Sequence, residues 1–158
     1  MSGSSDRHHD LMTGPGAPEP GGDGAGPGPM RSSMDLPAEL TRLREARAWA
    51  VAFMCRHCPD SGMDSVSDLR MVVDELACNA LRHARAPYRL ALTLHQDRLL
   101  IEVSDTSTEP AQPRDAYQDG GRGLTLIDAI ATRWGQEPRT EGKTVWAELP
   151  VRPGDDHG

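Results

Sequence analysis

The sequence lacks several features that mark common classes of protein. None of its 158 residues lie in an apolar run long enough to span a membrane, and no apolar segment follows the N-terminal basic residues as in a secretory signal. Its formal net charge of −7 provides no basic stripe for nucleic acid. Three cysteines without an export signal indicate reduced thiols. We therefore expect a cytoplasmic protein that binds neither nucleic acid nor membrane.

The N-terminal region also has almost no large apolar residues. It consists mainly of Gly, Pro and Ser, as in residues 14–18 and 26–29, and cannot bury enough surface to offset the entropy of ordering. We predict a disordered tail over residues 1–32, a single domain over 33–151 and a polar C-terminal tail over 152–158.

Apolar periodicity predicts the elements of the domain. Residues 38–57 and 65–85 repeat at three- and four-residue steps typical of helices, with Ser65 and Asp68 placed as a capping box at the start of the second. Alternation over 88–94 and 99–103 predicts two strands. Trp134 and the alternation over 145–149 predict the last strands, with Gly142 at the turn. A polar loop over 104–123 precedes a third helix. The fold class is α+β: a two-layer sandwich of a mixed or antiparallel sheet with helices on one face.

Glu75 and Asn79 form the first group of residues whose side chains are suited to binding or catalysis. They are four residues apart in the second predicted helix and therefore share one face. A carboxylate and a carboxamide one turn apart can serve as a proton acceptor and a metal ligand around a phosphorylated nucleotide. The alternative is a solvent-exposed Glu75 and an Asn79 that bonds locally.

Two further groups follow along the chain. Asp105 ends an apolar strand and can accept a hydrogen bond from an exocyclic amine such as that of adenine, although an Asp at a turn after a strand is common. The segment 119–124 is rich in glycine and opens the third helix, where backbone amides favour a phosphate. Many helices begin after such a turn, so the glycines alone are weak evidence for a phosphate-binding site.

Two rival sites have less support. Cys55 and Cys58 have the spacing of a thiol or metal pair, but no second cysteine pair accompanies them, so small thiols at a helix end are the alternative. Residues 142–144, Gly-Lys-Thr, resemble the end of a P-loop. However, Glu137 stands where the first glycine is required and a strand follows, so we reject the P-loop.

Taken in order, the motifs resemble the histidine-kinase-like ATPase superfamily, and more narrowly the anti-sigma-factor serine kinases and stand-alone ATP-binding regulators of actinobacterial type. The resemblance covers roughly residues 33–150 and implies a Bergerat-type ATP-binding fold that takes ATP and Mg²⁺. The segments that carry it are Glu75–Ala84, Val103–Ser107, Gly121–Leu126, Trp134–Gly135 and Gly142–Trp146.

The resemblance also implies roles for single residues. Asn79 would ligate Mg²⁺, Glu75 would act as general base on a serine hydroxyl of a partner protein, and Asp105 would bind the adenine amine. Thr144 would lie near the base, and His83 would have either a binding or a purely structural role. The nucleotide-binding residues implied in this way are Asn79, His83, Asp105, Ser107, Gly121, Arg122, Gly123, Leu124 and Thr144.

The function that the resemblance implies is that of an ATP-dependent serine/threonine kinase. Its substrate would be an anti-anti-sigma (STAS-type) antagonist, its second partner a sigma factor, and a homodimer is compatible with it. The sequence shows no phospho-accepting histidine domain before the fold, so we expect a protein that acts on a separate partner and not a complete sensor kinase. A non-catalytic ATP-gated interaction module is the alternative, because binding and transfer use nearly the same residues.

Overall fold

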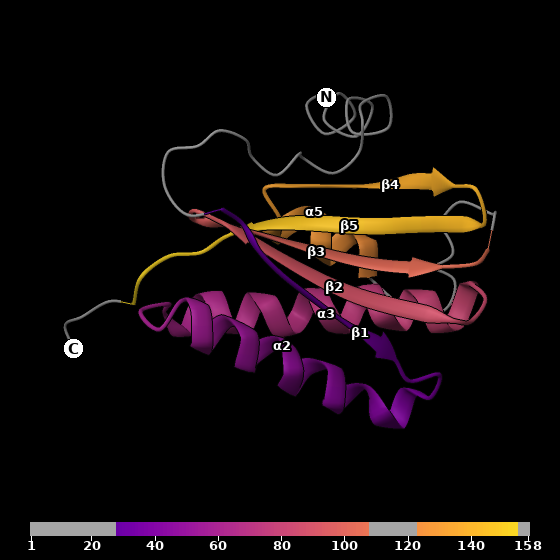
Figure 1. The fold of residues 1–158 in the computed structure, drawn as a ribbon, viewed down its shortest axis with the longest axis horizontal. Helices are drawn as coiled ribbons and strands as arrows, with labels where there is room; N and C mark the ends of the chain where they lie inside the picture. The colour runs from indigo at the N-terminus through magenta and orange to yellow at the C-terminus, as the bar shows by residue number, and fades with distance from the viewer. Residues whose placement is uncertain (1–27, 108–122, 155–158) are drawn as a thin grey trace.

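The computed structural model describes residues 28–107 and 123–154. Five antiparallel strands form one sheet in the order β1-β2-β3-β5-β4, and Figure 1 shows helices α2 and α3 as a second layer along it. The two-layer α+β fold expected from the sequence is thereby confirmed, with an antiparallel sheet. The elements are β1 Met30–Leu36, the 3₁₀ turn η1 Leu40–Arg42, α2 Leu43–His57, α3 Met63–His83, β2 Tyr88–His95, β3 Arg98–Asp105, α5 Gly123–Ile130, β4 Arg133–Arg139 and β5 Gly142–Pro150.

The core lies between the helices and one face of the sheet. Helix α3 is 21 residues long and places a continuous apolar stripe against the strands and against α2 and α5. Every second residue of the central strands meets that stripe, because side chains alternate between the faces of a sheet. The fully buried members are Leu69, Val72, Val73, Leu76, Ala77, Leu90, Leu92, Leu99, Ile101, Val103, Ala147 and Leu149.

The start of the sheet differs from the prediction. Residues 30–32, predicted as the end of a disordered tail, belong to β1, which pairs with β2 from Met30 opposite Leu94 to Leu36 opposite Tyr88. The composition of the N-terminal region concealed this strand, because its pairing with the distant β2 leaves no local pattern in the sequence. Residues 1–27 lie outside the described part of the chain.

The starts of the first two helices differ as well. The predicted helix 38–57 begins with the turn η1, and α3 begins at Met63, two residues before the predicted start. Ser65 does not cap α3, so the predicted capping box was wrong. Its hydroxyl accepts a hydrogen bond from the Arg152 amide at 3.0 Å and donates to the Arg152 carbonyl at 3.4 Å. Arg152 to Gly154, predicted as a polar tail, are thus fixed against the start of α3, where the Gly154 amide donates to Asp60.

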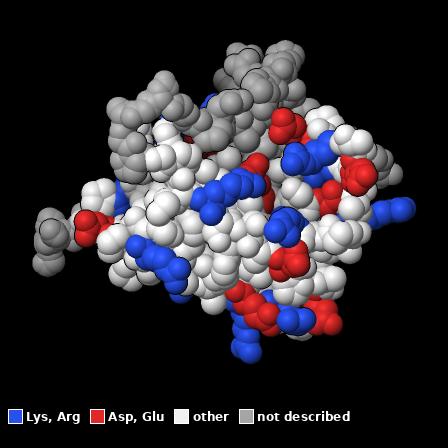
Figure 2. Space-filling view, viewed as in Figure 1, with Lys and Arg blue, Asp and Glu red and all other residues white. Residues whose placement is uncertain are grey.

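Charged side chains of both signs are mixed over the face drawn in Figure 2, and no large area of one sign appears among the described residues on that face. Several charged side chains of the described residues are paired, as in Arg89 with Asp35 at 2.7 Å and Arg47 with Asp74 at 2.6 Å. Within residues 28–107 and 123–154, no helix is long and apolar enough to cross a membrane.

Candidate functional site

Glu75, Asn79 and His83 lie at four-residue steps along α3, at one edge of its buried stripe. All three side chains are half-buried. Burial raises the pKa of the Glu75 carboxyl, the neighbouring Asp74 raises it further, and Arg82 opposes the shift. Among the described residues, no hydrogen bond or ion pair engages Glu75 or Asn79. The carboxylate and the carboxamide therefore retain their bonding capacity for a ligand.

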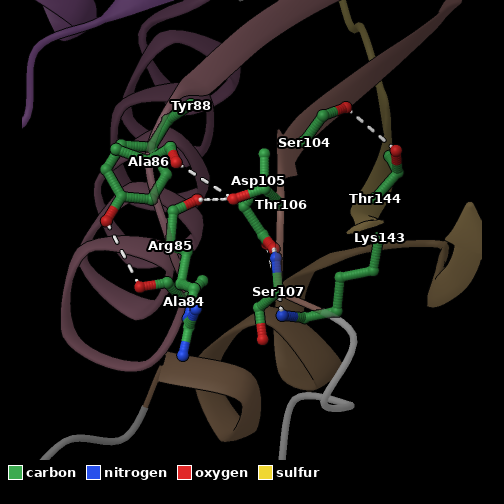
Figure 3. Close-up of polar contacts among 10 residues, drawn as sticks. All are labelled: Ala84, Arg85, Ala86, Tyr88, Ser104, Asp105, Thr106, Ser107, Lys143 and Thr144. Carbon is green, nitrogen blue, oxygen red and sulfur yellow. Dashed lines mark hydrogen bonds and ion pairs between the residues drawn. The ribbon is translucent and has the colours of Figure 1, made fainter. Parts of the chain in front are cut away.

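Asp105 is the last residue of β3 and is buried. Its Oδ1 atom accepts a hydrogen bond from the Ser107 amide at 2.7 Å, and its Oδ2 atom lies 3.2 Å from Lys143 Nζ. Lys143 is directly opposite Asp105 in the register of β3 and β5, so both side chains project from the same face of the sheet. Figure 3 shows the Lys143 side chain reaching from β5 toward Asp105 and Ser107. Asp105 and Ser107 were expected at this site from the sequence, whereas Lys143 was expected only as the start of the last strand.

Gly142 makes the contact between Lys143 and Asp105 sterically feasible. Its φ angle is +151°, a conformation that side-chain-bearing residues rarely adopt, and a Cβ atom there would overlap the Asp105 carbonyl oxygen and lie 2.7 Å from Thr106 Cα. The first residue of β5 therefore has to be glycine for the two strands to meet at this point.

Thr144 points to the opposite face of the sheet from Lys143. Its hydroxyl is 2.9 Å from the Ser104 hydroxyl, and both groups lie on the face away from the helices (Figure 3). The structure thus does not place the Thr144 side chain beside Asp105, where a residue near the base was expected.

The end of α3 is fastened to the end of β3. The Thr106 hydroxyl donates to the carbonyl oxygens of Arg85 and Ala86 at 2.9 and 3.0 Å, and the Thr106 amide also donates to Arg85. The Tyr88 hydroxyl donates to the Ala84 carbonyl at 3.4 Å (Figure 3). These bonds bring the helix that carries Asn79 and His83 together with the strand that carries Asp105.

The predicted phosphate-binding turn is described only in part. Gly121 and Arg122 lie outside the described residues, whereas Gly123 and Leu124 are the first two residues of α5. Helix α5 contacts α3 and is tied to β4 by a 2.9 Å hydrogen bond from Trp134 Nε1 to Asp128. The N-terminus of α5 therefore belongs to the helix layer that contains the edge of α3 with Glu75 and Asn79.

The alternative cysteine site gains no support. Cys55 is exposed and Cys58 is half-buried, and both are free thiols; burial raises the pKa of the Cys58 thiol. No group of three or more His, Cys, Asp or Glu side chains that could hold a metal ion occurs in the described part of the chain.

Comparison with known proteins agrees with the fold. No curated protein sequence matches the chain. The family model of the histidine kinase-like ATPase domain matches residues 36–149, from the end of β1 to the end of β5. Domains of this kind bind ATP, usually with Mg²⁺. The chain belongs to the family of histidine kinase-like ATPase domains.

Proposed function

We propose that this domain is an ATP-dependent regulator that phosphorylates a serine of an antagonist protein of the STAS type and also binds a sigma factor. The observation that supports the proposal most directly is the arrangement of Glu75 and Asn79. They lie on one edge of α3, half-buried and without a partner among the described residues, in a helix fastened to the strand that ends in Asp105.

Asn79 and Asp105 have the chemistry that binding of Mg²⁺ and ATP needs. The Asn79 carboxamide provides an oxygen ligand of the type that Mg²⁺ accepts, and phosphates and water supply the others. Bound there, Mg²⁺ neutralises charge on the phosphates. The Asp105 carboxylate has about four lone-pair positions, so it can accept the adenine amine in addition to the Ser107 amide and Lys143.

Glu75 is the residue that distinguishes an enzyme from a switch. In the transfer step, a serine hydroxyl of the partner attacks the terminal phosphorus of ATP, its proton passes to Glu75, and ADP leaves. Burial raises the pKa of Glu75 toward neutral pH, and this makes the carboxylate a better proton acceptor.

One observation favours the alternative, a non-catalytic module whose partner surface responds to ATP. No described residue hydrogen-bonds to Glu75, whereas a general base is usually oriented by a neighbouring group. In this case ATP binds and the partner is captured, but no phosphate is transferred.

Two measurements distinguish the kinase from the non-catalytic module. Calorimetry with Mg²⁺–ATP should show binding by the wild-type protein and loss of binding in Asn79→Ala. With γ-labelled ATP and an antagonist protein, Glu75→Gln should reduce transfer by about two to four orders of magnitude. Glu45→Gln makes the same chemical change at an exposed position of α2 and should leave transfer intact. ATP binding without transfer by the wild type would support the module, and no ATP binding would refute both functions.

A further inference from the structure

We infer that Lys143 is a base-reading residue that donates a hydrogen bond to ring nitrogen N1 of adenine, beside the amine that Asp105 accepts. The inference rests on the proposed ATP site and assigns a specificity role to Lys143, to which the family resemblance gave no role.

The strand register and burial hold the Lys143 ammonium next to the Asp105 carboxylate. The register of β3 and β5 places it opposite Asp105, and its side chain is only 7% exposed while that of Asp105 is 1% exposed. The ammonium lies 3.2 Å from Oδ2 and 3.4 Å from Oδ1. An adenine ring that contacts the Asp105 carboxylate would therefore also lie beside the Lys143 ammonium.

The two side chains have unused bonding capacity. A lysine ammonium has three N–H donors, and a carboxylate has about four lone-pair positions. Asp105 is the only hydrogen-bond or ion-pair partner of Lys143 among the described residues. The pair thus presents N–H donors next to a carboxylate acceptor whose position is fixed by the Ser107 amide.

This donor next to an acceptor complements one edge of adenine. The exocyclic amine at C6 donates to Asp105, and the adjacent ring nitrogen N1 accepts from Lys143. If the carboxylate alone read the base, N1 would have no protein donor from this pair. Thr144 does not supply that donor in the described structure, because its hydroxyl is bonded to Ser104 on the other face of the sheet.

The inference is tested with ATP and 1-deaza-ATP, in which a C–H group replaces N1. By calorimetry, the wild type should bind 1-deaza-ATP about tenfold to a hundredfold more weakly than ATP, as expected for loss of a hydrogen bond to a charged donor. Lys143→Met should bind ATP more weakly and the two nucleotides about equally. Lys143→Arg, which keeps a charged donor, should keep part of the difference in affinity between ATP and 1-deaza-ATP.

A second readout needs no variant. Lys143 is the only lysine in the sequence, so protein labelled with ¹³C at lysine Cε gives a single side-chain signal by NMR. ATP should shift that signal and 1-deaza-ATP should shift it much less.

The outcomes distinguish the inference from the function on which it rests. If the wild type binds both nucleotides equally, or if Lys143→Met discriminates as strongly as the wild type, Lys143 does not read N1 although the ATP site stands. The same conclusion follows if both nucleotides shift the lysine signal alike. If the wild type binds no ATP, the proposed function fails and the inference fails with it.

Discussion

The ion pair between Lys143 and Asp105 should contribute strongly to stability, and a double-mutant cycle can measure this. Two unit charges 3.2 Å apart attract each other by about 5 kcal/mol at an effective dielectric constant of about 20. Desolvation of both charges offsets most of that attraction, so removal of the whole pair costs no more than removal of one partner. Removal of one partner leaves a buried charge alone and costs about 3–5 kcal/mol.

The expected result follows from that asymmetry. Lys143→Met and Asp105→Asn should each lower the free energy of unfolding by about 3 kcal/mol, and the double variant by about the same amount. The coupling energy is then about 3 kcal/mol. Asn keeps an oxygen that can accept the Ser107 amide, so the second substitution disturbs the turn as little as the chain allows. Urea unfolding followed by circular dichroism measures all four proteins.

A second pair serves as the control. Arg47 and Asp74 are closer, at 2.6 Å, but their side chains are 37% and 36% exposed. Their coupling should be about 0–1 kcal/mol because water screens the charges. If the effects of the Lys143 and Asp105 substitutions simply add, or if the exposed pair couples as strongly, burial does not set the strength of the interaction and the reasoning is wrong.

Three further predictions concern other positions. Gly142→Ala should lower the free energy of unfolding by about 3 kcal/mol, because the backbone strain adds to the overlap with Asp105; an unchanged melting temperature would contradict this. Leu36→Ala should cost about 2–3 kcal/mol in urea unfolding if β1 is part of the fold, against about 0.5 kcal/mol for the exposed Met30→Ala; equal effects would contradict it. The pKa of Glu75 is raised, so the folded state binds the proton of this carboxyl more tightly than the unfolded state does. Ionisation of Glu75 therefore lowers the free energy of unfolding as the pH rises above about 4.5. Glu75→Gln should consequently gain stability relative to wild type between about pH 4 and pH 7. A difference between the two proteins that does not change with pH would count against that shift.

The sequence alone predicted the elements whose pattern is local. The apolar stripe of α3 and the alternation in β2 and β3 follow from periodicity, and the position of Asp105 at a strand end follows from them. Glu75 and Asn79 were placed on one helix edge by their spacing, and the structure brings that helix to the end of β3 through Thr106.

The contacts that the sequence did not predict depend on pairing between distant segments. The alternation identified β5 as a strand, but not its register against β3, and Gly142 permits a close approach of the two strands that no local pattern reports. Lys143 therefore appeared only as the start of a strand. The strand β1 was missed for the same reason, because its partner, β2, is more than fifty residues away along the chain.

The attachment of Arg152 and Gly154 to the start of α3 determines how the protein can be tethered. The Arg152 carbonyl accepts the Gly62 amide at 2.9 Å, and the Gly154 amide donates to Asp60 at 2.9 Å. Helix α3 rises by about 24 Å from Met63 to Asn79, at about 1.5 Å per residue. A fluorophore or a surface anchor joined on the C-terminal side of Gly154 would thus start from a fixed point at the far end of α3, remote from Asn79.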